Sequence, residues 1–325
     1  MSSTPASSAS AHTDATSRPT LRAVFVDANP TLGDIAQELS GTIDIPFTIN
    51  RQPDIRSDTL PATLAGAAIA LIDHTHFPTA IARQCEGLAH VVFLGTGARS
   101  YMNPEELGEL GIAVHTIKGY GDTAVAECAV ALMWTAARGF ARMDREMRTG
   151  SWVRTDALQL TGRTIGLLGF GGIAAEVARL ALGTGMKVLA WNRSPKTFPG
   201  VQFVALDRLL AESDVLSLHL LLNEETKNFL SRERIAALRP GAILINTARG
   251  ALVDEDAMID ALRSGHLRHA GLDVFTIEPL PAGHPLTTLP NVTLSAHSAF
   301  RTAEANRNLI NAALDHCRRI AAHGR

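Results

Sequence analysis

Short apolar runs alternate with helical patterns along the first third of the chain. The apolar runs have the length of β-strands, and they are Leu21–Asp27, Ala68–Ile72, His90–Leu94 and Ile112–Ile117. Helical spacing of apolar residues lies between them, near Thr31–Leu39, Thr79–Gly87 and Pro104–Leu110. This alternation predicts a parallel sheet with helices on both faces.

A second series of the same kind fills the rest of the chain. A long helical pattern, Thr123–Met147, comes first. Six apolar runs then predict strands at Thr164–Leu168, Lys187–Ala190, Val215–Leu218, Ala242–Asn246, Ala270–Asp273 and Val292–Leu294. The sequence therefore predicts a second parallel sheet in a domain of its own.

The chain ends in one amphipathic helix, near residues 300–322, which cannot bury a core by itself. We expect this helix to return to the N-terminal domain, which would then be discontinuous. The predicted boundaries are a disordered tail over residues 1–20, a substrate domain over 21–118 and 299–325, and a cofactor domain over 119–298. The expected substrate site is the cleft between the two domains.

Composition and charge exclude several classes of partner. The formal net charge is −2 with no basic run, so nucleic acid is not an expected partner. The longest apolar stretch, Ala124–Ala137, is interrupted by Glu127 and is too short for a bilayer, so no membrane is expected either.

Three separated cysteines, Cys85, Cys128 and Cys317, show no metal-binding spacing. They favour reduced thiols in a cytoplasmic protein without a metal site. An organelle transit peptide in the Ser/Thr/Ala-rich residues 2–17 stays open as an alternative to a disordered tail.

The segment Gly169-Phe170-Gly171-Gly172-Ile173-Ala174 follows the predicted strand Thr164–Leu168 and precedes a helical pattern. Glycines in a strand–turn–helix context allow a pyrophosphate to approach the free N–H groups of the helix N-terminus. Ala174 stands where a third glycine is usual, and a small residue suffices there. The motif predicts dinucleotide binding, the alternative being an ordinary glycine-rich βα turn.

Three residues suited to acid–base and carboxylate chemistry follow neighbouring predicted strands. Arg249 follows the strand Ala242–Asn246, Glu278 follows the strand that ends at Asp273, and His297 lies just beyond Val292–Leu294. Ligands of open α/β sheets bind at the carboxyl ends of the strands. The planar fork of Arg249 suits a carboxylate, and a carboxylate on one imidazole nitrogen orients the ring and leaves the other for proton transfer. Each residue could also serve as a solvated polar group or an ion-pair partner.

The predicted strand after the glycine motif bears on the choice of cofactor. It ends in Trp191, and Asn192, Arg193 and Ser194 follow. An acidic residue at such a strand end binds the ribose 2′-hydroxyl of NAD and repels a 2′-phosphate. Because Asn192 is uncharged and Arg193 and Ser194 suit a phosphate, the sequence predicts a preference for NADP(H) over NAD(H). The alternative is that Arg193 points into solvent and the protein uses either cofactor.

Several ordered motifs give the chain a specific resemblance. Matching segments are Gly119–Glu127, Leu160–Gly166, the glycine motif, Asn246–Gly250, Gly271–Phe275, Glu278–Leu280, and Asn291-Val292 with His297. In these the chain resembles the D-isomer-specific 2-hydroxyacid dehydrogenase family over almost everything after residue 20. The resemblance implies an α/β fold in which a Rossmann cofactor domain is inserted into a discontinuous flavodoxin-like substrate domain.

The resemblance also implies roles for individual residues. Arg249 would hold the substrate carboxylate, His297 would exchange a proton with the substrate oxygen, and Glu278 would hold the imidazole. Substrate contacts are implied for Gly95, Thr96, Gly97, Arg249 and His297. Cofactor contacts are expected from Gly169, Phe170, Gly171, Gly172, Ile173, Asn192, Arg193, Ser194, His219, Thr226, Thr247, Ala248, Arg249, Asp273 and His297. For Asp273, a role in a strand-end turn is an equal alternative.

Together these features predict an oxidoreductase that transfers a hydride between NAD(P)H and a small 2-oxo acid, giving the D-2-hydroxy acid. A glyoxylate or hydroxypyruvate reductase-like enzyme is the first interpretation. The alternatives are an enzyme similar to 3-phosphoglycerate dehydrogenase and a nucleotide-sensing binding protein of the corepressor type. The apolar helix region 123–147 predicts a homodimer. The segment after Gly97 departs from the family pattern, as does the stretch from His219 to Thr226, which lacks two usual prolines. The substrate itself stays open.

Overall fold

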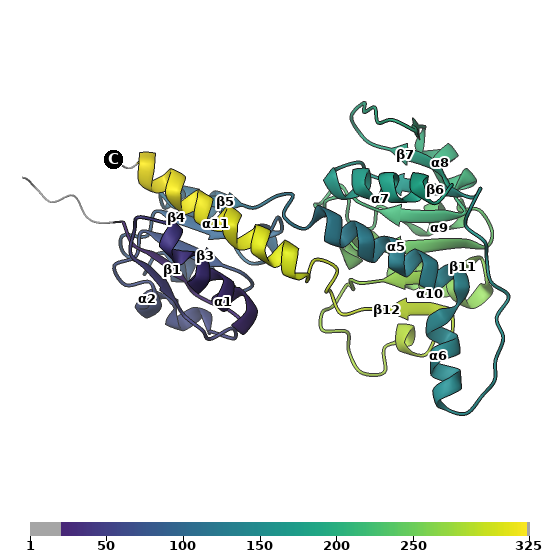
Figure 1. Cartoon of the computed structure of the whole chain (residues 1–325), viewed down its shortest axis with the longest axis horizontal. Coiled ribbons are helices and arrows are strands. Elements are labelled where there is room, and N and C mark those ends of the chain that lie inside the picture. Colours follow the sequence, from purple (N-terminus) through teal and green to yellow (C-terminus); the bar gives the residue numbers. More distant parts are fainter. Residues whose placement is uncertain (1–20, 324–325) are drawn as a thin grey trace, which may run out of the picture. The chain divides into compact units, whose positions relative to one another are not determined.

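A computed structural model describes residues 21–323 and divides them into two compact units (Figure 1). Unit 1 holds the described residues up to Ile117 together with those from Ile310 onward. Unit 2 is the continuous segment Lys118–Leu309. The predicted disordered tail, residues 1–20, lies outside the described residues.

Unit 1 is built on a five-stranded parallel sheet with the strand order β2-β1-β3-β4-β5. This is the flavodoxin-like order, which reverses beside β1. The strands are β1 (Ala23–Phe25), β2 (Phe47–Ile49), β3 (Ile69–Ile72), β4 (His90–Phe93) and β5 (Ala113–Thr116). The helices are α1 (Pro30–Leu39), α2 (Leu60–Thr63), α3 (Thr79–Ala82) and α4 (Pro104–Glu109), with 3₁₀ turns η1 (Ser40–Thr42), η2 (Ser57–Thr59) and η3 (Ala98–Ser100).

The last helix, α11 (Ala303–His323), completes unit 1. Ile310, Ala313, Leu314 and Cys317 recur at helical spacing, and all four are fully buried. The part of the chain furthest in sequence from β1 therefore supplies part of the core of the same unit, and the fold is discontinuous as expected.

Unit 2 is built on a seven-stranded parallel sheet with the order β12-β11-β10-β9-β6-β7-β8. The strands are β6 (Thr164–Leu168), β7 (Lys187–Trp191), β8 (Val201–Phe203), β9 (Val215–Leu218), β10 (Ala242–Asn246), β11 (Leu267–Leu272) and β12 (Val292–Leu294). The helices are α5 (Asp122–Arg138), α6 (Phe140–Arg148), α7 (Gly172–Gly183), α8 (Leu206–Glu212), α9 (Arg232–Ala236) and α10 (Glu255–Ser264), with 3₁₀ turns η4 (Gly250–Leu252) and η5 (Pro285–Thr287). The order reverses between β6 and β9, where Rossmann sheets bind dinucleotides.

Both faces of the unit 2 sheet are covered by helices, as its nearly continuous apolar strands require. Ile165 and Leu167 belong to a core cluster with residues of α5 and α7. Leu168 and Leu244 belong to a second cluster with residues of α8, α9 and α10. Successive residues of one strand thus serve opposite cores, and the two-domain α/β fold predicted from the sequence is confirmed.

Three details of the sequence prediction were wrong. The pattern Thr123–Met147 is not one helix, because Gly139 adopts φ 68°, ends α5 and starts α6 at a bend of 65°. The strands β2 and β8 were missed, since each is a three-residue edge strand whose side chains are largely half-exposed. The helix expected over Thr79–Gly87 stops at Ala82.

Within residues 21–323 no single helix is long and apolar enough to cross a bilayer. The helices α5 and α6 reach that length and composition only together, across their bend.

Candidate active site

The three glycines of the turn after β6 differ in what a side chain would meet there. Gly169 has φ 91°, and a Cβ on it would lie 2.7 Å from the carbonyl oxygen of His219. Gly172 is the first residue of α7, and a Cβ on it would collide with the carboxylate of Asp122. Beside Gly171, in contrast, a Cβ would meet no atom within 4 Å. The turn is therefore closed on two sides and open at Gly171, in front of the helix N-terminus.

Asn192 ties the end of β7 to this turn. Its Oδ1 accepts a hydrogen bond from the amide of Phe170 at 3.1 Å, and its Nδ2 donates to the carbonyl of Ser194 at 2.8 Å. The guanidinium of Arg193 pairs with the carboxylate of Glu225 at 2.8 Å. Asn192 is thus a structural link, and the charged group at this strand end is Arg193.

The loop after β9 holds two residues for which cofactor contacts were predicted. His219 Nε2 lies 2.9 Å from Ser217 Oγ, and burial lowers the pKa of His219 to about 4. The ring is therefore neutral at physiological pH. The hydroxyl of Thr226 donates to the carbonyl of Leu221 at 2.5 Å and accepts from the amide of Asn223 at 2.8 Å. Both side chains shape the loop, a role that sequence reasoning did not assign to them.

The loop after β10 is held by Asn246, the last residue of the strand. Its Oδ1 accepts from the amide of Ala248 at 3.0 Å, and its Nδ2 donates to the carbonyl of Arg249 at 2.9 Å. The guanidinium of Arg249 is half-buried and donates to the carbonyl of Ala248 at 2.6 Å. The hydroxyl oxygen of Thr247 is buried and finds no hydrogen-bond partner in the described part of the chain. A buried hydroxyl of this kind is satisfied by water or by a polar ligand atom.

Close backbone packing brings the Arg249 loop to the loop that carries Glu278. A Cβ on Gly250 would collide with the backbone of Phe275 and Thr276, so only glycine allows this approach. The amide of Phe275 in turn donates to Glu278 Oε1 at 2.9 Å. One short chain of contacts therefore links the Arg249 loop to the carboxylate of Glu278.

Glu278 and His297 form a hydrogen-bonded pair. The distance between Glu278 Oε2 and His297 Nδ1 is 2.6 Å, and the two side chains are 34% and 36% exposed. His297 adopts φ 47°, which is uncommon for a residue other than glycine, and its ring packs edge-on against Phe300. With Nδ1 engaged by the carboxylate, Nε2 is the nitrogen left for proton exchange.

Asp273 anchors the loop that carries His297. Its fully buried carboxylate accepts hydrogen bonds from Ser295 Oγ at 2.6 Å and from the amides of Ser298 and Ala299, each at 3.0 Å. The sequence left two roles open for Asp273. The structure shows the hydrogen bonds of the strand-end role, while a contact with the cofactor stays a prediction. An aspartate directly after a buried strand was visible in the sequence, but the groups that donate hydrogen bonds to it were not.

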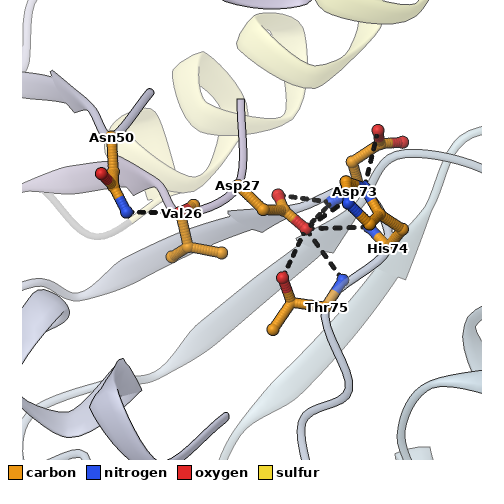
Figure 2. A network of polar contacts seen from close by, with 6 residues as sticks. All are labelled: Val26, Asp27, Asn50, Asp73, His74 and Thr75. Carbon is orange, nitrogen blue, oxygen red and sulfur yellow. Dashed lines mark hydrogen bonds and ion pairs between the residues drawn. The ribbon is translucent and has the colours of Figure 1, made fainter. Parts of the chain in front are cut away.

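In unit 1, a buried carboxylate orders the carboxyl edge of the sheet (Figure 2). Asp27, after β1, accepts hydrogen bonds from three consecutive amides after β3, those of Asp73 (2.9 Å), His74 (2.8 Å) and Thr75 (2.8 Å). The hydrogen bond between His74 Nδ1 and the Asp73 carboxylate, 3.1 Å long, is the main cause that raises the pKa of His74 to about 9. The sequence analysis did not single out Asp27.

Two further features lie at this edge of unit 1. A hollow of about 490 Å³ is lined by residues 53–58, by Ile81 and by the segment His74–His76. The segment Gly95-Thr96-Gly97, predicted to contact substrate, follows β4, and the amide of Gly95 donates to the carbonyl of Phe93 at 2.9 Å. Within residues 21–323 no three His, Cys, Asp or Glu side chains form a group that could hold a metal ion.

Comparisons with known proteins identify the family of the chain. Residues 130–299, more than half of the chain, match the family model described as D-isomer specific 2-hydroxyacid dehydrogenase, NAD binding domain. A hydroxypyruvate reductase of Thermotoga maritima is 42% identical over 62% of this chain and 67% of its own length. A glycerate dehydrogenase of Methylorubrum extorquens is 32% identical over 80% of this chain and 84% of its own.

Solved structures extend the likeness to nearly the whole chain. The structure of an acyclic imino acid reductase (Bsp5) in complex with NADPH and D-Arg is similar with a TM-score of 0.83. The two sequences are 27% identical, and the match covers 93% of this chain and 98% of that one. On the family match, the curated relatives and this shared fold, the chain belongs to the D-isomer specific 2-hydroxyacid dehydrogenase family.

Proposed function

We propose that this protein reduces a small 2-oxo acid, of the glyoxylate or hydroxypyruvate type, to the D-2-hydroxy acid with a nicotinamide cofactor. The observation that carries the proposal is the Glu278–His297 pair, 2.6 Å apart, beside the loop of Arg249. A carboxylate-oriented imidazole and a guanidinium on adjacent loops are the groups that a keto acid needs for protonation and for binding. The names of the relatives point to the same substrate class.

The residues at the glycine turn fit a dinucleotide. The open side of Gly171 faces the N-terminus of α7, where N–H groups and the helix dipole favour a pyrophosphate. The unpartnered hydroxyl of Thr247 is a second polar contact suited to the cofactor. We propose that the residues from Gly169 to Ile173 hold the pyrophosphate and that Thr247, Ala248 and Asp273 lie on the nicotinamide side. A bound nicotinamide supplies or accepts the hydride.

The chain's own residues perform the remaining tasks. Arg249 binds the substrate carboxylate through its planar fork. His297 donates a proton to the substrate oxygen during reduction and removes it during oxidation, while Glu278 holds the ring through Nδ1. The Gly95 amide already donates to the carbonyl of Phe93, so within the segment Gly95-Thr96-Gly97 we propose the amides of Thr96 and Gly97 as substrate contacts. General acid–base catalysis of this kind contributes about 10²- to 10⁴-fold to the rate.

We propose that the cofactor is NADP(H) in preference to NAD(H). Asn192 leaves the end of β7 without a carboxylate, and Arg193 and Ser194 lie next to it. The imino acid reductase of similar structure was solved with NADPH, which supports the same choice. A ratio of kcat/KM for NADPH over NADH well above one is expected, and a ratio of one or less contradicts the preference.

The activity is tested with a panel of 2-oxo acids and NADPH, monitored by the loss of cofactor absorbance. Glyoxylate and hydroxypyruvate should be turned over, and 3-phosphohydroxypyruvate tests the alternative of a phosphoglycerate dehydrogenase-like enzyme. His297→Ala should lose most of the rate and keep its cofactor affinity. Cofactor binding without turnover of any acid would instead favour a nucleotide-sensing protein.

We further propose a cytoplasmic homodimer formed through the helix region 123–147. Phe140 and Met147 of α6 are 52% and 56% exposed, and Trp152 in the following segment is 77% exposed, an apolar surface that a partner would cover. A light-scattering mass of twice 34.6 kDa is expected, and a mass of 34.6 kDa excludes the dimer. The domain boundaries stay a prediction, with the cofactor domain over residues 119–298 and the substrate domain over 21–118 and 299–325; the compact unit 2 runs on to Leu309.

A further inference from the structure

One ion pair joins the loops that follow β7 and β9, the strands on either side of β6. Arg193 Nη1 and Glu225 Oε2 lie 2.8 Å apart, and β6 is the strand that leads into the glycine turn. The pair therefore occupies the edge at which, on the proposed function, the adenosine end of the cofactor binds.

We propose that Glu225 is a specificity-determining residue, which competes with the 2′-phosphate of NADP(H) for the guanidinium of Arg193. This inference rests on the proposed dinucleotide site, and it assigns to Glu225 a role in setting how strongly the protein distinguishes NADPH from NADH. Arg193 attracts a 2′-phosphate, whereas Glu225 both neutralises Arg193 and repels the phosphate.

The backbone positions of both partners are fixed. Arg193 lies between Asn192 and Ser194, whose side chain and carbonyl are joined by a hydrogen bond of 2.8 Å. Glu225 lies in a turn closed by Thr226 and Asn223, where the Thr226 amide donates to Asn223 Oδ1 at 3.0 Å. Because the two loops are held, the two charged side chains meet without a rearrangement of the backbone.

The pair is weak enough for a phosphate to displace it. The Arg193 and Glu225 side chains are 80% and 73% exposed, so water screens their attraction. A phosphate monoester carries about −1.5 to −2 charges at pH 7, against one for the carboxylate, and offers more acceptor oxygens. The 2′-phosphate therefore displaces Glu225 from the guanidinium of Arg193. Breaking the ion pair lowers the affinity for NADPH, and NADH binding does not require it to break.

The test compares Glu225→Gln with the matched control Glu224→Gln, which removes an equal charge from the neighbouring exposed position. Dissociation constants for NADPH, NADH, 2′,5′-ADP and 5′-AMP are measured by calorimetry, so the result does not depend on the oxo acid substrate. Glu225→Gln should bind NADPH and 2′,5′-ADP about fivefold more tightly, the fold-change that corresponds to about 1 kcal/mol for an exposed pair. Affinity for NADH and 5′-AMP should stay within twofold.

Arg193→Gln completes a double-mutant cycle. It should weaken NADPH binding about tenfold, and in its background the gain from Glu225→Gln should shrink, because only the direct repulsion between Glu225 and the phosphate is left to relieve. The inference is overturned if Glu225→Gln changes NADPH and NADH affinity equally, if Glu224→Gln gives the same gain, or if Glu225→Gln gives its full gain in the Arg193→Gln background. If the wild-type protein prefers NADH yet Glu225→Gln still shifts the ratio, the inference stands and only the proposed NADP preference fails. If neither dinucleotide binds, the proposed function falls as well.

Discussion

The amide of His297 donates a hydrogen bond to the carbonyl oxygen of Asp273 at 2.7 Å, while the Asp273 carboxylate accepts bonds from residues on both sides of His297. One residue at the end of β11 therefore fixes the loop after β12 through both its main chain and its side chain. The unusual φ of 47° at His297 is maintained by this anchor.

Asp273→Asn is expected to destabilise unit 2 and to disorder the His297 loop. An amide replaces one of two acceptor oxygens with a donor that faces an N–H or O–H group, and this costs about 3 kcal/mol in the free energy of unfolding. The melting temperature and kcat should both fall. The exposed Asp44→Asn serves as control, and a variant with an unchanged melting temperature would contradict the anchoring role.

Glu278→Gln should reduce kcat on the order of 10²-fold and leave the dissociation constant of the cofactor unchanged. The Gln oxygen can still accept from the Phe275 amide, but its NH₂ group then faces His297 Nδ1, which must become an acceptor. The ring then lacks the carboxylate that orients it. Steady-state rates and calorimetric cofactor binding check this result, with the exposed Glu304→Gln as control. Full activity in Glu278→Gln would remove the carboxylate from the mechanism.

Gly169→Ala should lower the melting temperature and abolish cofactor binding. Its φ of 91° is strained for alanine, and the new Cβ would lie 2.7 Å from a main-chain oxygen of His219 that cannot rotate away. The matched control is Gly183→Ala at the end of α7, where a Cβ would meet no atom within 4 Å. That change should be neutral or stabilise by up to about 1 kcal/mol. Equal melting temperatures of the two variants would refute the close approach at Gly169.

The stability of unit 1 should depend on pH through His74. Its pKa is raised from 6.5 to about 9, so the protonated ring stabilises the fold fully below pH 6.5, and this contribution is lost as the pH rises through 9. The melting temperature of His74→Gln should therefore lie below that of the wild type at pH 6, and the two melting temperatures should converge by pH 10. His76→Gln, whose native ring packs on Tyr101, is the control. A melting difference between His74→Gln and the wild type that does not change with pH would reject the assignment.

The sequence predicted the sheets because their inner strands consist mostly of apolar residues and lie between clear turn signals. The edge strands β2 and β8 were not predicted, since each has three residues and no fully buried side chain. The break between α5 and α6 at Gly139 was not predicted either, because the apolar pattern continues across it and a glycine within a helix is tolerated at a cost of about 1 kcal/mol.

The candidate site was predictable to the extent that strand ends mark it. Arg249, Glu278 and His297 each follow a strand, and the contact between Glu278 and His297 is present in the structure. The Asp273 anchor, the Asp27 network and the Arg193–Glu225 pair were not predictable. Each depends on distances between loops from different strands, which local patterns do not encode.

Because α11 is buried in unit 1, the core of that unit can be completed only late in synthesis. Its residues Ile310, Ala313, Leu314 and Cys317 fill the first unit, whose sheet is complete by Thr116. During synthesis the part of this core that α11 supplies is therefore missing until nearly two hundred more residues have been translated. The core around the earliest strands is completed only after all of unit 2 has been made.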